Sequence, residues 1–481
     1  MKNKGLVSAT LTMALLCLSK ACFANEEFET WKKNQSSDFN SYLSAEQSAF
    51  KKALESEWES FLLSQPEQLY EQPKLDEPPI AKDTPDEKKE DNQEPSISPP
   101  SIDTPEPSQP QQNPSSPPVA PDYEDIAYLG KVYQLPKISL SYLPLSAEAI
   151  DISNAWESLY PDIMKVVSHI SEASETKALS DWGLISLLDL YSESQSHGDE
   201  NGQKLLLWAL LMELGFDCRI AYNQTNLFVL MPSMQKIYGK AALNMDGRDF
   251  YILKGGSPEG SLYTHTTTLD NPKSFDFSFQ NQPAVYEFSS QAKTLYDAYS
   301  GLAVTYQSYS QLASYYRSHP SLDFVWYFRA QPSGRHYESL VADLERELEG
   351  LSELSKVNKL LSLVQHGFEY LRDDEQWGEE YYATPMHTLM LDAVDCEDRS
   401  FLFAFLVEQV VGLKTVGLKY PGHLAVAVEL NENHPNPEAD YVDVDGHKFY
   451  VSDPTYIGAS VGQAMTIFDG IAPSVIDKNI L

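Results

Sequence analysis

Three residues in the C-terminal third of the chain have the types that a thiol nucleophile requires, namely Cys396, His423 and Asp453. Cys396 opens an apolar stretch with helical spacing, and the unpaired N–H groups at a helix start stabilise a thiolate and lower its pKa. His423 begins one expected strand, and Asp453 ends the next. If both strands pack on that helix, the imidazole reaches the thiol and the carboxylate fixes the imidazole tautomer. The alternative is that Cys396 is a buried core thiol.

The elements that would position these residues occur twice in the chain. The stretch "NGQKLLLWALLMELGF" from Asn201 is similar to "CEDRSFLFAFLVEQVVGL" from Cys396. Further along, "MDGRDFYIL" from Met245 matches "VDGHKFYVS" from Val444. In each copy the apolar positions change from helical spacing to the alternation that is typical of strands. The sequence therefore predicts the α+β fold class, with two similar domains in tandem.

The stretches that contain the three candidate residues resemble a known family. "DCEDRSFLFAFL", "YPGHLAVAV" and "YVSDPTYIGASVG" are similar to the three signature blocks of the bacterial transglutaminase-like superfamily. The resemblance implies a papain-like fold and a Cys-His-Asp triad. In that triad Cys396 is the nucleophile, His423 the general base and acid, and Asp453 the orienting carboxylate. The resemblance covers residues 327–481 directly and the first copy only through the internal repeat.

The same resemblance implies a donor to the oxyanion from a segment upstream of the nucleophile. Gln365, in "LLSLVQ", has the suitable residue type and order for this role. The alternative is that Gln365 is a solvated glutamine on a helix. No cofactor and no metal are expected, since no Cys or His spacing suggests zinc. Calcium stays open because an acidic, aromatic loop at 371–382 precedes the candidate nucleophile.

The first copy carries none of these reactive groups. The internal alignment places Asn201, Asn226, Lys254 and Asp189 at the positions of Cys396, His423, Asp453 and Gln365. Because this copy keeps the apolar frame and the "DG" turn without the chemistry, we interpret it as a degenerate, pseudoenzyme domain. Cys218 matches no site position, so we expect a buried small side chain that forms no bridge to Cys396.

The amino terminus has the pattern of an export signal at residues 1–24. Two lysines precede an apolar run too short to span a bilayer, and Ala24 suits signal-peptidase cleavage. A periplasmic or secreted location follows, and a lipoprotein anchored through Cys22 is the alternative. In residues 25–64 aromatic and leucine side chains recur every eleven residues, which predicts one long amphipathic helix. Such a helix would self-associate, dock on a partner or fold back on its own protein.

The remainder of the chain divides by composition. Residues 65–123 are rich in proline and acidic residues and are predicted to be a disordered linker. Residues 124–290 are expected to form the degenerate domain, 291–340 a helical and extended connector, and 341–481 the catalytic domain. The linker would let the folded part reach away from an anchoring helix.

The net charge of −35 argues against nucleic acid as a partner, because a polyanion would be repelled. We therefore expect an envelope thiol hydrolase, similar to cysteine peptidases, that cleaves a peptide or isopeptide amide through an acyl-thioester at Cys396. Its substrate would be an envelope protein or the peptide stems of the cell wall, with which it would associate. The alternatives are a non-catalytic two-domain adaptor and a cross-linking transglutaminase, in which an amine resolves the acyl-enzyme.

Overall fold

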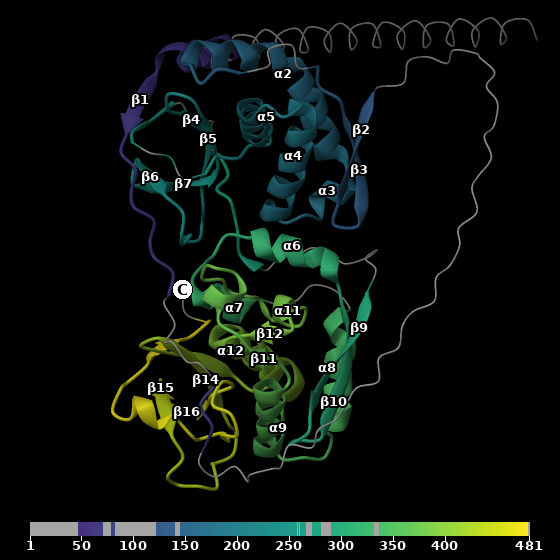
Figure 1. Cartoon of the computed structure of the whole chain (residues 1–481), viewed down its shortest axis with the longest axis vertical. Helices are drawn as coiled ribbons and strands as arrows, with labels where there is room; N and C mark the ends of the chain where they lie inside the picture. Colours follow the sequence, from purple (N-terminus) through teal and green to yellow (C-terminus); the bar gives the residue numbers. More distant parts are fainter. Residues whose placement is uncertain are drawn as a thin grey trace, which may run out of the picture.

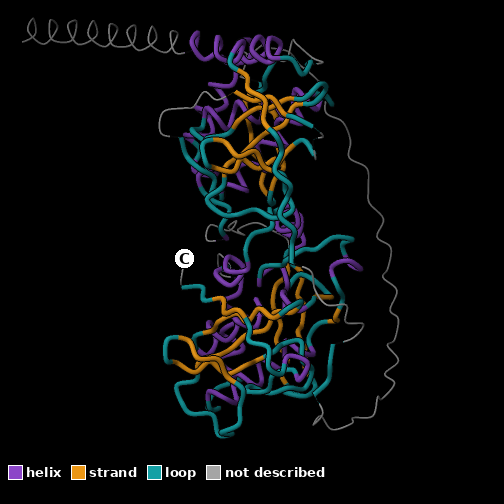
Figure 2. Tube along the Cα trace, turned by 90° about the vertical axis from the view of Figure 1, so that its left-hand side faces the viewer, coloured by secondary structure: helices purple, strands orange, loops and turns teal. Residues whose placement is uncertain are grey.

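The computed structural model describes residues 47–70, 78–81, 122–139, 145–256, 258, 260–265, 272–279, 290–330 and 336–479. The expected signal peptide, residues 25–46 of the expected helix and residues 71–77 and 82–121 of the expected linker lie outside these ranges. The described chain is a mixture of helix and sheet with two curled half-barrel sheets, one in each half of the molecule (Figure 1). Figure 2 shows these two halves stacked along the long axis. Among the described residues, no helix combines the length and the apolar character needed to cross a membrane.

The first half places helices against one sheet. Its helices are α2 (Ala149–Glu172), α3 (Ser174–Lys177), α4 (Asp181–Ser196) and α5 (Glu200–Glu213). Its strands are β1 (Trp58–Phe61), the hairpin β2 (Tyr123–Tyr128) and β3 (Lys131–Pro136), then β4 (Arg219–Tyr222), β5 (Leu227–Pro232), β6 (Ala242–Met245), β7 (Arg248–Lys254) and β8 (Leu262–His265). The sheet has the strand order β1-β8-β4-β5-β7-β6.

The second half repeats this plan with extra short elements. Its helices are α6 (Ser310–Ser318), α7 (Phe324–Arg329), α8 (His336–Glu347), α9 (Glu353–His366), α10 (Asp373–Gln376), α11 (Pro385–Thr388) and α12 (Cys396–Leu406), which a π-helical turn at Val407–Val411 extends. Its strands are β9 (Gln291–Asp297), β10 (Leu302–Ser308), β11 (Glu369–Tyr370), β12 (Ala393–Val394), β13 (Thr415–Tyr420), β14 (His423–Glu429), β15 (Tyr441–Val444), β16 (His447–Ser452) and β17 (Ser474–Ile476).

The two sheets share one strand order. In the first half it runs β8-β4-β5-β7-β6, and in the second β17-β13-β14-β16-β15. The "DG" turns that join β6 to β7 and β15 to β16 also share a backbone conformation, with φ of 54° and 77° at Asp246 and Gly247, and 51° and 83° at Asp445 and Gly446. Two residues with positive φ match the twist of a tight hairpin. The internal repeat of the sequence is therefore also a repeat of topology.

The hairpin β9–β10 corrects the expected connector at 291–340. Tyr306 on β10 donates a hydrogen bond to the Leu389 carbonyl at 2.7 Å, and Lys293 on β9 donates to the Met390 carbonyl at 2.9 Å. Leu295 also lies so close to Gly367, at the end of α9, that a Cβ there would be 2.6 Å from its Cδ1. These contacts make the hairpin part of the second half rather than a connector.

The N-terminal segment corrects the expected helix at 25–64. Residues 47–56 are helical, but Trp58–Phe61 form strand β1, which pairs antiparallel with β8. The described part of the apolar stripe packs against the first half of the protein. Leu54 is fully buried, and the Phe50 ring lies 5.0 Å from that of Trp156 and 6.3 Å from that of Trp208.

The segment after β1 corrects the expected linker at 65–123. Residues 65–70 and 78–81, which we call the strap, lie against the folded protein. The Glu67 carbonyl accepts a hydrogen bond from Gly239 N–H at 3.0 Å, and Ala81 N–H donates to the Ile457 carbonyl at 2.8 Å. In Figure 1 this part of the chain descends from β1 along one side of the molecule to the second half.

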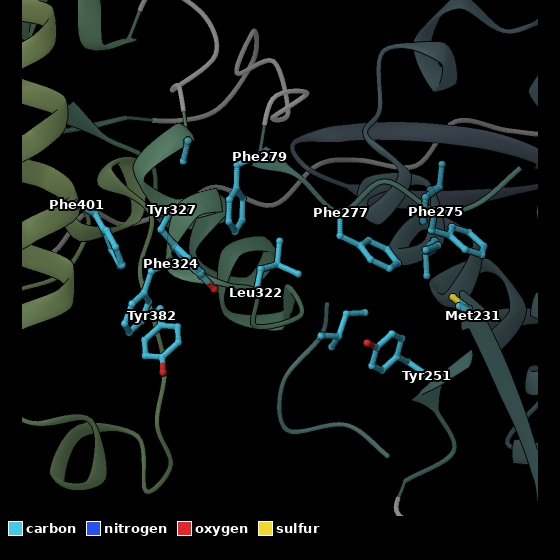
Figure 3. Close-up of a cluster of buried hydrophobic side chains, with 14 of the residues drawn as sticks. Met231, Tyr251, Phe275, Phe277, Phe279, Leu322, Phe324, Tyr327, Tyr382 and Phe401 are labelled. Carbon is cyan, nitrogen blue, oxygen red and sulfur yellow. The ribbon is translucent and has the colours of Figure 1, made fainter. Parts of the chain in front are cut away.

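A shared apolar core connects the two halves. Figure 3 shows Phe275 and Phe277 on the side of the first half, and Phe279, Leu322 and Tyr327 on the side of the second. All five residues are buried. Leu322 forms an antiparallel bridge with Ile237 of the first half, and the Phe279 and Tyr327 rings are 4.9 Å apart. Such close-packed contacts fix the halves relative to each other.

Candidate active site

Cys396 is the first residue of α12, a helix that is buried on every side. All residues from Cys396 to Leu406 are buried, because α12 lies between α9 and the sheet strand β14. From Phe401 to Leu406 every residue is apolar, as expected for a helix in such a central position, whereas the first turn carries buried charged side chains. The N-terminal position that the sequence predicts for the thiol is therefore confirmed, and its side chain is 1% exposed.

His423 and Asp453 meet at one end of the second sheet. Strands β14 and β16 are antiparallel neighbours, so the residue that begins β14 lies beside the residue that follows β16. The His423 Nε2 and Asp453 Oδ2 atoms are 2.8 Å apart, and both side chains are almost fully buried. The sequence predicted this pair from its places on two neighbouring strands, and the distance confirms it.

The surroundings of the pair fix the orientation of the imidazole. Asp453 Oδ1 accepts a hydrogen bond from Thr455 N–H at 2.9 Å, which leaves Oδ2 for His423. The His423 ring stacks on Phe468 at a centroid distance of 5.4 Å and an angle of 12°. With Nε2–H donating to a carboxylate, Nδ1 carries the lone pair of the neutral ring. Within the described structure this buried Nδ1 has no hydrogen-bond partner.

The Cys396 thiol does not bond to that nitrogen. Its Sγ atom donates to Glu397 Oε2 at 3.0 Å, and the backbone N–H of Leu424 hydrogen-bonds the sulfur. Leu424 directly follows His423, so the thiol and the imidazole belong to the same site. The direct thiol–imidazole hydrogen bond that the sequence predicted is nevertheless absent between these described residues.

The pKa of the thiol also departs from the sequence-based expectation. Burial, followed by the negative charges of Glu397 and Asp395, raises the pKa of Cys396 well above its ordinary value. The Leu424 N–H opposes this rise, but it does not reverse it. Cys396 is therefore a neutral thiol in this arrangement, and the expected lowering of its pKa by the helix start is wrong for the structure as it stands.

Carboxyl groups gather behind the thiol. Asp373, Asp395, Glu397 and Asp398 are all buried. Burial and the Asp395 charge raise the pKa values of Glu397 and Asp398 far above their ordinary range. Asp398 accepts a hydrogen bond from Ala383 N–H at 2.7 Å, which anchors the loop before α12. In the described part of the chain no group of His, Cys, Asp or Glu side chains has the arrangement of a metal site.

Gln365 does not have the contacts of an oxyanion donor. Its side-chain amide donates to the carbonyls of Asp453, Tyr456 and Ala459 at 3.1, 2.8 and 3.1 Å, and its Oε1 accepts from Gly458 N–H at 3.2 Å. These bonds hold the loop that follows β16, and this loop contains Asp453. The expected oxyanion role is corrected, because Gln365 is a buried positioning residue rather than a solvated or catalytic one.

Arg399 is a buried charge that the sequence analysis did not single out. Its guanidinium donates to the carbonyls of Gln365 and Phe368 at 3.1 and 3.0 Å, which ties the end of α9 to α12. Burial lowers its pKa to about 10. Its position in a helix with mostly apolar residues could have indicated this role, because a buried guanidinium requires fixed hydrogen-bond acceptors.

The first half keeps the contacts of the site without its chemistry. Asn201, aligned with Cys396, accepts a hydrogen bond from Leu227 N–H at 2.9 Å through its Oδ1. This is the counterpart of the bond from Leu424 N–H to the Cys396 sulfur. Lys254 and Asp189, aligned with Asp453 and Gln365, form an ion pair at 2.5 Å. At the position of Cys396 the first half therefore keeps the backbone hydrogen bond of the second, with an amide oxygen as the acceptor.

Cys218 belongs to the core of the first half. It is a free, buried thiol, and burial raises its pKa far above the ordinary value. Its sulfur contacts the Trp208 carbonyl at 3.5 Å. Cys396 is likewise a free thiol, so the described structure has no bridge between the two.

Comparison of the whole chain with protein-family models and with curated proteins gives no match. The chemistry of this site is therefore argued from its own residues.

Proposed function

We propose that the chain is a thiol hydrolase of the cell envelope that cleaves a peptide or isopeptide amide. In this proposal the second half has the papain-like fold of transglutaminase-like proteins, and the first half is its degenerate copy. The supporting observation is the buried His423–Asp453 pair at 2.8 Å, beside a thiol at a helix tip whose sulfur is bonded by the N–H that follows His423. The export signal supports the location.

The reaction follows from the two nitrogens of His423. Rotation of the Cys396 side chain from Glu397 towards Nδ1 lets the imidazole take the thiol proton. The thiolate attacks the amide carbon, the C–S bond forms, and the C–N bond breaks as His423 returns the proton to the amine. Water then attacks the thioester, with His423 as its base, and releases the acid and the thiol. Asp453 stabilises the imidazolium throughout.

The entering nucleophile separates two versions of this activity. Water gives hydrolysis, and an amine such as a lysine side chain gives the cross-link of a true transglutaminase. Both versions use the same acyl-thioester at Cys396, so the site residues have the same roles in each. The envelope location and the cysteine peptidase-like site favour hydrolysis of a surface protein or a wall peptide.

One observation favours a second function, that of a non-catalytic adaptor. The thiol is buried and bonded to Glu397, and burial together with the nearby carboxylates raises its pKa. A permanently neutral thiol would serve packing alone. The intact His423–Asp453 pair argues against this reading, because the aligned positions of the first half lost both groups.

The experiment is a search for products in the envelope. Envelope proteins from cells with the native chain are compared by mass spectrometry with those from cells carrying Cys396→Ala, and Cys218→Ala is the matched control. Thiol hydrolysis predicts new peptide termini in the native and Cys218→Ala cells that disappear with Cys396→Ala. Amine-linked peptides with the same dependence identify transfer instead. Identical proteomes in all three strains support the adaptor.

A further inference from the structure

The strap contacts the two segments of the second half that carry the candidate base and its carboxylate. One end of the strap, at Tyr70, lies at the turn between β13 and β14, immediately before His423. The other end, at Ile80, pairs with Ile457, four residues after Asp453. The two described parts of the strap therefore contact the segments that carry both members of the His423–Asp453 pair.

Tyr70 is fixed by hydrogen bonds at both its backbone and its side chain. Its backbone N–H donates to the Tyr382 hydroxyl at 2.8 Å, and its own hydroxyl donates to the Tyr420 carbonyl at 2.8 Å. The backbone N–H of His423 reaches the same hydroxyl. Burial raises the pKa of the Tyr70 hydroxyl above its ordinary value. Because Tyr420 pairs with His423 across the β13–β14 hairpin, the hydroxyl lies at the end of the sheet that carries the candidate base.

The Tyr70 ring fills an aromatic subsite. It meets the Phe324 ring edge-on at 5.3 Å, and the Lys419 ammonium lies 4.7 Å from its centroid. Edge-to-face pairs and cation–π contacts of this kind select an aromatic ring over an aliphatic side chain. The subsite therefore has a specificity that does not depend on the strap being its occupant.

The second end of the strap pairs with the second half through its backbone. Ala81 N–H donates to the Ile457 carbonyl at 2.8 Å, and Ile457 N–H donates to the Pro79 carbonyl at 2.9 Å. This is a parallel bridge, while the Ile80 side chain stays 65% exposed. Backbone pairing with an exposed segment is how extended peptides are bound irrespective of most of their sequence.

A third contact secures the strap to the first half. Besides the bond from Gly239 to its carbonyl, Glu67 forms an ion pair with Lys236 at 2.6 Å. Because β1 directly precedes the strap and is part of the first sheet, the strap is tethered to its target. Tethering gives a weak contact a high effective concentration, so modest interactions keep the site covered.

We propose that the surface around Cys396, His423 and Asp453 is a binding site for an extended peptide with an aromatic side chain, and that the strap is its resident intramolecular occupant. The strap covers the thiol until a competing peptide displaces Tyr70. The substrate class, an extended peptide that places an aromatic ring beside Lys419 and Phe324, rests on the proposed function. The covering of Cys396 by the strap does not.

The test is the rate at which iodoacetamide alkylates Cys396 in the full mature chain, resolved from Cys218 by peptide mapping. Tyr70→Ala removes the ring and is expected to accelerate alkylation of Cys396 by about tenfold or more, because the thiol no longer waits for the strap to open. Tyr296→Ala is the matched control, since Tyr296 is 59% exposed on β9 and far from the strap in the chain. Cys218 should react at an unchanged, slow rate in every variant.

A second variant and a peptide complete the design. Ala81→Pro removes the N–H that bonds Ile457 and should also accelerate alkylation, which keeps the test valid if Tyr70→Ala is poorly folded. A synthetic peptide of residues 64–81 added to the Tyr70→Ala chain should restore protection. The same peptide with Ala in place of Tyr should not.

The outcomes separate the two proposals. Equal alkylation of Cys396 in native, Tyr70→Ala and Ala81→Pro chains overturns the strap inference, whatever the activity. Faster alkylation in the variants, with no cleavage of any aromatic or non-aromatic peptide, keeps the strap as occupant and removes the hydrolase function and its substrate class. If the variants cleave peptides with and without an aromatic residue at the same rate, only the aromatic subsite is overturned.

Discussion

At the scale of single residues, the site contains the His423–Asp453 hydrogen bond but lacks a hydrogen bond between Cys396 and His423. His423 and Asp453 already have the geometry of a base and its orienting group, whereas the Cys396 thiol is bonded to Glu397 and is kept neutral by burial. A thiol in this state is protected from oxidation and alkylation, because the thiolate is the reactive form. In the proposed reaction, activation therefore requires a change in the surroundings of Cys396 rather than in those of His423.

The buried carboxyl groups give stability a definite pH dependence. Burial and the Asp395 charge raise the folded-state pKa of Asp398, so the folded chain keeps a proton that the unfolded chain releases above about pH 4. Stability is then greatest below that pH and falls as the pH rises towards the folded-state pKa. We expect Asp398→Asn, which retains the acceptor for Ala383, to increase the free energy of unfolding at pH 8 by about 1–3 kcal/mol.

Urea unfolding at pH 4.5 and pH 8 measures this effect. At pH 4.5 the native and Asp398→Asn chains should have nearly equal stability, because the aspartic acid is then protonated in the fold. Glu375→Gln, at an exposed position of α10, is the control for a lost surface charge. A gain from Asp398→Asn that is the same at both pH values would contradict the raised pKa.

At the scale of elements, the loop after β16 is held by α9. The Gln365 side-chain amide donates hydrogen bonds to carbonyls of this loop. We therefore expect Gln365→Leu to lower the free energy of unfolding by about 1–3 kcal/mol without any substrate present. Asp189→Leu, the aligned change in the first half, breaks a partly exposed ion pair and should cost about 1 kcal/mol or less. Thermal unfolding checks both values. Unchanged stability with a loss of activity alone would restore the oxyanion role for Gln365.

The hairpin β9–β10 provides a second test at this scale. A Cβ at Gly367 would lie 2.6 Å from Leu295 Cδ1 and 2.6 Å from the Leu363 carbonyl. We expect Gly367→Ala to destabilise the chain by about 1–3 kcal/mol through overpacking. Leu295→Ala should relieve part of that cost in the double variant, which a double-mutant cycle of unfolding free energies measures. Strictly additive effects would show that the hairpin does not pack on α9.

At the scale of the whole molecule, the N-terminal segment is part of the fold. Its helix at residues 47–56 packs on the first half, β1 joins the first sheet, and the strap contacts the second half. Leu54 is fully buried, so Leu54→Ala is expected to cost about 2–5 kcal/mol. Leu62, which is 82% exposed, provides a matched control with an expected change within about 0.5 kcal/mol for Leu62→Ala.

Chemical unfolding at several protein concentrations measures this prediction. Because the structure docks Leu54 on its own chain, the cost should not depend on concentration. A cost that appears only at concentrations where the chain associates would mean that the stripe serves self-association instead.

The sequence predicted those features that depend on periodicity and order. The repeated change from helical to strand spacing located α12, β14 and β16, and these elements bring His423 to Asp453. Periodicity does not give side-chain direction, so the turn of the Cys396 thiol to Glu397 and of the Gln365 amide to a loop was not foreseen. The strap was missed because its proline-rich composition is typical of linkers, and only Leu69, Tyr70 and Ile80 hinted at contacts with the fold.

Acylation of the thiol is the most direct test of the central claim that Cys396 is a nucleophile activated by His423. The native and Tyr70→Ala chains are incubated with an activated ester of a peptide, quenched in acid and mapped by mass spectrometry. We expect an acyl group on Cys396 and none on Cys218, with formation slowed by about 10²-fold or more in His423→Ala. Equal acylation of both cysteines would contradict this role of Cys396. So would an acylation rate that is unchanged by His423→Ala even in the Tyr70→Ala chain.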